Sequence, residues 1–81
     1  MQVLYFAWLK ERIGVGSEEI SSNAATARAL AQDLAGRDER YALAFADLSA
    51  VRVAVDQEMV DLDASIEGAR EVAFFPPVTG G

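Results

Sequence analysis

Residues 71–81 read Glu-Val-Ala-Phe-Phe-Pro-Pro-Val-Thr-Gly-Gly, and this stretch decides how the chain folds at its C-terminal end. Residues 72–75 are all apolar, which predicts a β-strand over residues 71–75. Pro76 and Pro77 lack the N–H that a sheet ladder needs, so the strand must end at Phe75. We therefore expect a folded domain over residues 1–75 and a flexible, extended tail over residues 76–81, on the order of 19 Å long at about 3.1 Å per residue.

The tail ends in Gly80-Gly81. Because glycine lacks a Cβ, such an end can enter a narrow channel and leave its carboxyl group open to a nucleotide or a nucleophile. Gly-Gly endings also arise by chance, and Gly-rich chain ends are ordinary. The position of the Gly-Gly pair favours a functional C-terminus, because the tail follows an apolar strand with no charged linker between them. Any chemistry is expected at the C-terminal carboxyl group.

The composition restricts which other functions are possible. The chain has 81 residues, 52% of them hydrophobic, which suits one small globular domain. It has no histidine and no cysteine, which excludes disulfides, thiolate metal sites and Ser-His-Asp or Cys-His nucleophiles. We expect neither a metal site nor a bound cofactor.

The net charge of −6 is concentrated toward the tail. Residues 56–81 contain six acids and one base, and Lys10 is the only lysine of the chain. Nucleic acid is therefore not an expected partner, whereas a basic protein surface is, although solubility alone also explains the charge. Met1 leads directly into a strand-like run, and no apolar run approaches the ~20 residues of a membrane span. The expected location is cytoplasmic, away from membranes.

The N-terminal half shows strand and helix patterns. The apolar run of residues 2–9 predicts a strand buried on both faces, and residues 17–22 predict an edge strand folded back on it through a turn at Gly14 and Gly16. Thr26 is a candidate N-cap, and Gly36 can close the helix at C′. The helix is indicated by apolar residues at i, i+3, i+4 and i+7, namely Ala27, Leu30, Ala31 and Leu34.

The rest of the chain completes a small sheet. Residues 37–46 indicate an irregular or short helical crossover, and residues 51–56 alternate like a half-buried strand that turns at Asp56-Gln57. Residues 59–62 would be its hairpin partner, and residues 66–68 a single turn before the last strand. This order predicts an α+β fold of the ubiquitin-like β-grasp type, with a mixed sheet of about five strands on one main helix.

Strand alternation predicts which side chains face the helix. The residues expected inside are Val3, Tyr5, Ala7, Leu9, Val72 and Phe74. The residues expected to form an exposed apolar patch on the other face are Leu4, Phe6, Trp8 and Phe75, with Met59 beside them. Such patches often mark interfaces. The alternatives are that the crossover at residues 41–48 covers this face, or that the alternation is assigned wrongly.

Side chains offer weaker candidates for chemistry. The pairs Glu18-Glu19 and Asp61-Asp63 suggest acid/base or metal groups, but both are interpreted as solvated surface acids because carboxylates are rarely buried. Arg52 and Arg70 are likewise interpreted as surface charges. The sequence therefore indicates no side-chain active site.

Three stretches together resemble a known family. These are residues 71–81, residues 3–7 (Val-Leu-Tyr-Phe-Ala) and residues 10–14 (Lys-Glu-Arg-Ile-Gly). They resemble the small subunit of molybdopterin synthase, and the resemblance extends over essentially the whole chain. Two departures alter turn polarity and hence loop contacts. The family often shows Asp-Gly-Asp-Glu-Val where residues 67–72 read Glu-Gly-Ala-Arg-Glu-Val, and Asn-Gln where this chain has Asp56-Gln57.

The resemblance implies a sulfur carrier that is not catalytic alone. An E1-like adenylyltransferase would adenylate Gly81 with ATP and Mg²⁺, and a sulfur donor protein would convert the adenylate to a thiocarboxylate. The large subunit of molybdopterin synthase, in a heterotetramer, would then pass the sulfur to cyclic pyranopterin monophosphate, building the dithiolene of the molybdenum cofactor. Gly80 would keep the passage clear. The residues expected to bind the partner are Phe6, Met59, Phe75, Pro76, Pro77, Val78 and Thr79.

Three other functions stay open. A sulfur carrier for thiamine or cysteine synthesis would share the fold and the Gly-Gly end, although the full run of residues 74–81 favours molybdopterin. A ubiquitin-like protein modifier would join Gly81 to lysines of target proteins. A plain interaction module would have an inert tail.

Overall fold

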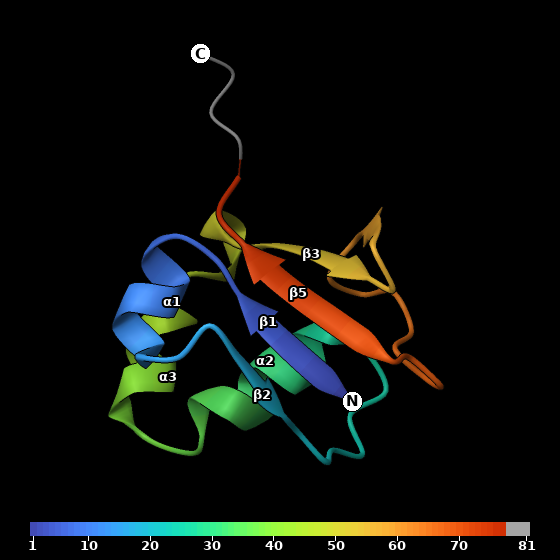
Figure 1. The fold of residues 1–81 in the computed structure, drawn as a ribbon, viewed down its shortest axis with the longest axis horizontal. Helices are drawn as coiled ribbons and strands as arrows, with labels where there is room; N and C mark the ends of the chain where they lie inside the picture. Colours follow the sequence, from blue (N-terminus) through green and yellow to red (C-terminus); the bar gives the residue numbers. More distant parts are fainter. Residues whose placement is uncertain (78–81) are drawn as a thin grey trace.

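A computed structural model describes residues 1–77 of the chain. It shows one five-stranded sheet in the order β2-β1-β5-β3-β4, with β5 at the centre. In Figure 1 the sheet lies in front and α2 crosses behind it. The strands are β1 Gln2–Tyr5, β2 Ser17–Glu19, β3 Arg52–Val55, β4 Glu58–Val60 and β5 Glu71–Phe75. The helices are α1 Trp8–Ile13, α2 Ala27–Ala35, α3 Glu39–Ala44 and the 3₁₀ turn η1 Leu48–Ala50.

The strand pairing confirms the predicted mixed sheet of the β-grasp type. β1 pairs antiparallel with β2 and parallel with β5, while β3 pairs antiparallel with both β5 and β4. A parallel pair needs a long crossover, and the chain between β1 and β5 contains α2 and α3 together with the other strands. Because β5 is the central strand, the segment that follows it leaves the sheet from its middle, at the end where β5 stops.

α2 forms as predicted, apart from its last residue. The Thr26 hydroxyl accepts a hydrogen bond from the N–H of Ala29 at 3.1 Å, so Thr26 is the N-cap, and the predicted apolar stripe is buried. Gly36, however, is the C-cap in an ordinary right-handed conformation with φ −78°. Gly36 therefore closes the helix as predicted, but as the C-cap rather than as C′, and Arg37 N–H still donates to the carbonyl of Leu34 at 3.0 Å.

The strand predicted over residues 2–9 is wrong beyond Tyr5. The backbone turns at Ala7, where φ is 54°, and residues 8–13 form α1. Leu9 and Ile13, one helical turn apart, are both buried, so this apolar run serves two elements with different periods. Ala7 is consequently exposed rather than inside, and Trp8 lies on the helix rather than on the outer face of a strand.

The core lies between the sheet and the helices. Tyr5 and Phe74 stack with ring centroids 6.5 Å apart, and Phe45 meets Phe74 edge-on at 5.0 Å. Tyr41 on α3 packs against Tyr5 from the same side, with centroids 6.3 Å apart. The crossover therefore contains the short helix that was one of its two predicted forms, and its aromatic residues cover the helix side of the sheet.

The β3–β4 hairpin turns at Asp56 and Gln57, as predicted. Both have positive φ, 50° and 71°, which is the geometry of a two-residue type I′ turn. β4 ends at Val60 instead of continuing to residue 62, because the chain then bends toward α2, where Arg28 N–H donates to the Leu62 carbonyl at 2.7 Å. None of the helices in residues 1–77 has the length and apolarity needed to cross a membrane.

Candidate functional site

The point where the tail begins is fixed by two neighbouring strands. β5 is hydrogen-bonded to β1 on one side and β3 on the other up to its last residues, and Phe6 N–H donates to the Phe74 carbonyl at 3.1 Å. Pro76 and Pro77 follow and are half-buried. The remaining predicted site residues lie outside the described part of the chain; they are Val78, Thr79, Gly80 and Gly81.

The face of the sheet turned away from the helices, here called the outer face, carries a row of apolar residues. The register places Leu4 beside Ala73, Ala73 beside Ala54, and Ala54 beside Met59. Met59 is 69% exposed. Because Ala73 and Ala54 are small, the middle of this row is recessed between the larger side chains of Leu4 and Met59 on the flanking strands. The outer face thus offers a shallow apolar surface.

Two aromatic residues extend this surface to the root of the tail. Phe6 directly follows β1 and is 47% exposed, and continuing the β1–β5 register by one residue places it beside Phe75. Phe75 is half-buried and occupies the last position of β5. The structure therefore brings Phe6, Phe75, Leu4 and Met59 to one face, as the alternation predicted. Their binding to a partner stays a prediction.

Trp8 does not belong to this surface. It is the first residue of α1, and the guanidinium of Arg12 lies 4.9 Å from the centroid of its ring. A helical reading of residues 8–13, from the apolar spacing of Leu9 and Ile13, would have removed Trp8 from the predicted patch.

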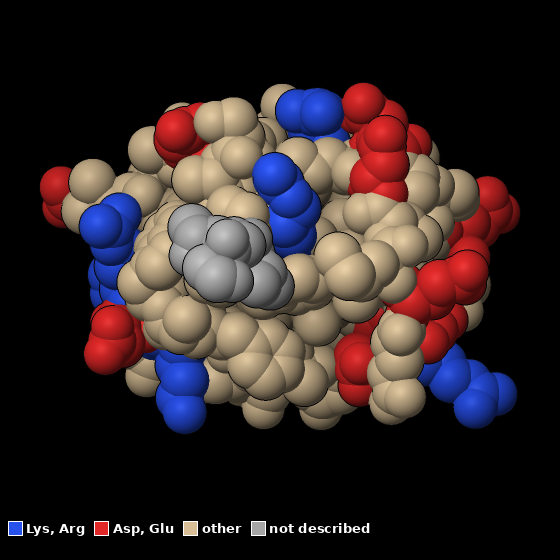
Figure 2. Space-filling model, turned by 90° about the horizontal axis from the view of Figure 1, so that it is seen from above, with Lys and Arg blue, Asp and Glu red and all other residues tan. Residues whose placement is uncertain are grey.

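The charges near the tail are unevenly placed. Figure 2 looks onto the end of the molecule from which the tail leaves, and uncharged side chains cover most of this end. Acidic side chains gather on the right of the view, the side on which Figure 1 shows β3. Arg52, predicted only as a surface charge, lies directly opposite Phe75 in the β3–β5 register. The alternation of Arg52 with Val53 in β3 is the signal that would have placed it on the outer face.

Glu18 is not the solvated acid that was predicted. The hydroxyls of Tyr5 and Tyr41 both donate to its Oε2 atom, at 2.8 Å and 2.7 Å, and Glu18 is half-buried. Burial and the bond to this carboxylate raise the pKa of both tyrosines above the ordinary value. The reason is the β1–β2 register, in which Glu18 lies opposite Val3 on the helix-facing side. Glu18 therefore links β2 to α3 through a hydrogen bond and lies away from the tail.

The other predicted surface acids behave as expected. Asp63 is 68% exposed and pairs with Arg28 at 2.6 Å, which holds the pKa of Asp63 below its usual value. Asp61 accepts from the Asp63 N–H at 2.7 Å, and Glu19 pairs with the Met1 amino group at 2.8 Å. Among residues 1–77, no three acidic side chains come close enough together to hold a metal ion.

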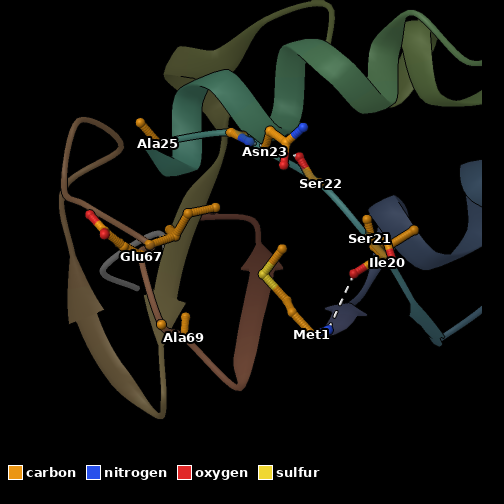
Figure 3. Close-up of a pocket in the computed structure, with 11 residues that line it drawn as sticks. Met1, Ile20, Ser21, Ser22, Asn23, Ala25, Glu67 and Ala69 are labelled. Atoms are coloured by element: carbon orange, nitrogen blue, oxygen red, sulfur yellow. Dashed lines mark hydrogen bonds between the residues drawn. The ribbon is translucent and has the colours of Figure 1, made fainter.

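A shallow hollow of about 570 Å³ lies at the other end of the sheet (Figure 3). Met1 projects into it, and the Met1 amino group donates to the Ile20 carbonyl at 3.2 Å. Ser22 and Asn23 approach it from the segment before α2, while the Glu67 carboxylate points away from Met1. Because this hollow adjoins the start of β1 and β5, whereas the tail leaves from the end of β5, it is not part of the tail site.

Comparison with known proteins identifies relatives over the full length of the chain. The model of the ThiS family matches residues 3–81. The molybdopterin synthase sulfur carrier subunit of Escherichia coli is 41% identical over 100% of this chain and 99% of its own. The protein of the same name from Haemophilus influenzae is 38% identical over the same shares.

Solved structures share the fold. A putative molybdopterin converting factor, subunit 1, from Pyrococcus furiosus superimposes with a TM-score of 0.73 at 29% identity, covering 95% of each chain. SAMP1 from Haloferax volcanii superimposes with a TM-score of 0.72 at 24% identity, covering 100% of this chain and 98% of its own. The second likeness concerns the fold alone.

Proposed function

This chain belongs to the ThiS family and to the family of the molybdopterin synthase sulfur carrier subunits, and from that premise we propose that it carries sulfur on Gly81 for molybdopterin synthesis. The observation that carries the proposal is the position of β5. This strand is the centre of the sheet, and the chain passes from it directly to Pro76 and Pro77. A firmly held strand gives the C-terminal segment a fixed point of departure.

The chemistry proposed for Gly81 follows from the properties of a carboxylate. An α-carboxyl group with a pKa near 3.5 is ionised at neutral pH and is a poor electrophile. It would therefore attack the α-phosphate of ATP on an E1-like enzyme with Mg²⁺, releasing pyrophosphate and forming an acyl adenylate. A donor protein would supply sulfur as a persulfide, whose outer sulfur would displace AMP from the acyl carbon, and a thiol would then cleave the S–S bond to leave a thiocarboxylate and a disulfide. We expect this ATP-dependent step to take place in the cytoplasm.

The thiocarboxylate sulfur would then act as a soft nucleophile on the acceptor. In the large subunit of molybdopterin synthase it would pass to cyclic pyranopterin monophosphate, and water would return the Gly81 carboxylate. Because the dithiolene holds two sulfur atoms, two charged tails would be consumed for each product. Gly80, without a Cβ, would let the tail enter a narrow channel.

The outer face supports the proposal because its apolar surface is continuous with the tail. Phe6, Phe75 and Met59 lie on this face, and covering their exposed parts would contribute a fraction of the roughly 1.5–3 kcal/mol that full burial of a large apolar side chain provides. A partner that covered them would hold the body while the tail, with Val78 and Thr79, entered the channel. Two small and two large subunits in a heterotetramer are the proposed assembly.

Two other functions use the same C-terminal chemistry. The ThiS match also fits a sulfur carrier for thiamine or cysteine synthesis. A protein modifier would instead form an isopeptide bond between Gly81 and a lysine of another protein. The products separate these functions, because a carrier yields a free thiocarboxylate and a modifier yields conjugates of higher mass.

The intact mass of the protein tests the proposal. The chain is incubated with an E1-like enzyme, ATP, Mg²⁺ and a sulfur source, and the C-terminal peptide is expected to gain one sulfur in place of one oxygen. A chain that lacks Gly81 is the control, and it should stay unmodified and fully folded. Large subunit and cyclic pyranopterin monophosphate are then added, and molybdopterin should form. A C-terminus that stays unmodified while an established carrier is converted in the same assay would refute the proposal.

A further inference from the structure

One basic side chain shares the outer face with the apolar surface at the root of the tail. Arg52 lies opposite Phe75 in the β3–β5 register, and side chains directly opposite in an antiparallel pair have Cβ atoms about 4.5–5.5 Å apart. Arg52 is exposed, whereas Ala54, the next residue of β3 on this face, is half-buried. The outer face therefore combines apolar area and a positive charge where the tail begins.

The guanidinium of Arg52 is held in place by backbone carbonyls. Its Nη1 atom donates to the carbonyls of Ser49 and Val51, at 3.1 Å and 3.2 Å. Both carbonyls belong to η1 and the residue after it, and Asp47 caps this turn by accepting from Ser49 N–H at 3.1 Å. Because an arginine has five N–H donors, most remain available for a ligand while the side chain is already oriented.

Arg52 has no acidic partner among residues 1–77. Arg28 and Arg40, in contrast, pair with Asp63 and Asp38. The acid that shares the outer face, Glu71, is four residues along β5 from the partner of Arg52, roughly 13 Å at about 3.3 Å per residue. This separation exceeds the Debye length of about 8 Å at physiological ionic strength, so Glu71 does not neutralise Arg52.

We propose that Arg52 binds a carboxylate of the large subunit, at the rim of the channel that receives the tail. The inference rests on the proposed function and adds to it the chemistry of the contact. As Phe75 and Phe6 become covered, the guanidinium beside them loses water, and an acidic side chain of the partner replaces that water. Such a pair at a rim speeds association and fixes the orientation of the docked body. The partner surface is thus apolar at its centre and carries an acid next to the channel entrance.

The test compares the affinity of the large subunit for charge variants of the carrier by isothermal titration calorimetry. The variants are R52E, R52Q and R52K, and the matched control is R70E, which reverses an exposed charge just before the start of β5. R52E is expected to raise the Kd at least about tenfold at about 0.05 M salt, with a smaller loss at about 0.5 M salt. R52Q should fall between R52E and the wild type, while R52K and R70E should bind like the wild type within about threefold.

Each outcome decides a separate question. An R52E affinity equal to that of the wild type overturns the inference, as does an R52K loss as large as that of R52E, because the two carbonyl contacts would then be the function of Arg52. An R52E variant that binds the large subunit normally but is thiocarboxylated slowly also overturns it, since the carboxylate would belong to the activating enzyme. If the wild type itself binds no large subunit, the proposed function fails and the inference with it. Thermal unfolding of each variant verifies that it is folded.

Discussion

Replacing Glu18 with alanine should destabilise the fold far more than its position in an edge strand suggests. Its Oε2 atom accepts hydrogen bonds from Tyr5 and Tyr41, which come from β1 and α3. Tyr5 is only 1% exposed and Tyr41 only 6%, so neither hydroxyl gains full access to water when the carboxylate is removed. The variant E18A therefore leaves two buried donors without their acceptor.

The size of the loss follows from the two bonds. A hydrogen bond to a charged group contributes about 1.5–3 kcal/mol, and an unsatisfied buried donor costs a similar amount. Because Glu18 is itself half exposed, we take the lower end for each bond. The free energy of unfolding should then fall by about 3 kcal/mol, which lowers the Tm of a domain of this size by roughly 12–24 °C.

Urea unfolding followed by circular dichroism measures this loss. E18Q keeps an acceptor oxygen at the same place and should lose less than E18A. E19A is the matched control, because Glu19 is 68% exposed and pairs only with the chain terminus, so its loss should stay within about 1 kcal/mol. The reasoning is refuted if E18A costs less than about 1 kcal/mol, or if E19A costs as much as E18A.

Three further predictions concern the turn, alkaline pH and the outer face. Gln57 has a left-handed φ of 71°, so Q57G should raise the free energy of unfolding by about 0.5–1 kcal/mol in urea, and a loss would contradict the proposed backbone strain. The raised pKa values of Tyr5 and Tyr41 mean that their contribution to stability is complete below about pH 10, the pKa of an unfolded tyrosine, and is lost as the pH rises further. Urea unfolding should therefore become easier from about pH 10 upward, by up to about 1.4 kcal/mol per pH unit for each tyrosine, and an unchanged midpoint to pH 11 would argue against it. Met59 is 69% exposed, so M59D should change stability by no more than about 0.5 kcal/mol yet weaken large-subunit binding about tenfold, and normal binding would remove Met59 from the docking surface.

Local patterns predicted the elements whose signals do not depend on distant contacts. Thr26 and the apolar stripe of α2 lie within one helical segment, and the end of β5 at Phe75 follows from the missing N–H of Pro76. The Asp56-Gln57 turn is equally local. These features depend only on residues that are neighbours in the sequence, so the sequence alone predicts them.

The boundary between β1 and α1 could not be read in this way. Residues 2–9 are apolar enough for a single strand, but β1 ends at Tyr5, close to the point where its partner β5 ends at the prolines. The left-handed turn at Ala7 then starts α1. An error of this kind moved Trp8 onto the wrong surface.

The sequence by itself determined the composition of the site: a last strand stopped by two prolines, a Gly-Gly end, and alternating residues that place Phe6 and Phe75 on one face. Only the tertiary structure decided that Arg52 lies opposite Phe75 on that face and that the Glu18 carboxylate accepts hydrogen bonds from two tyrosines. The physical reason is the sheet register, which pairs residues that lie more than sixty positions apart in the sequence, such as Leu4 and Ala73. Register is fixed by the burial of the whole inner face at once, and no single segment of the chain contains that information.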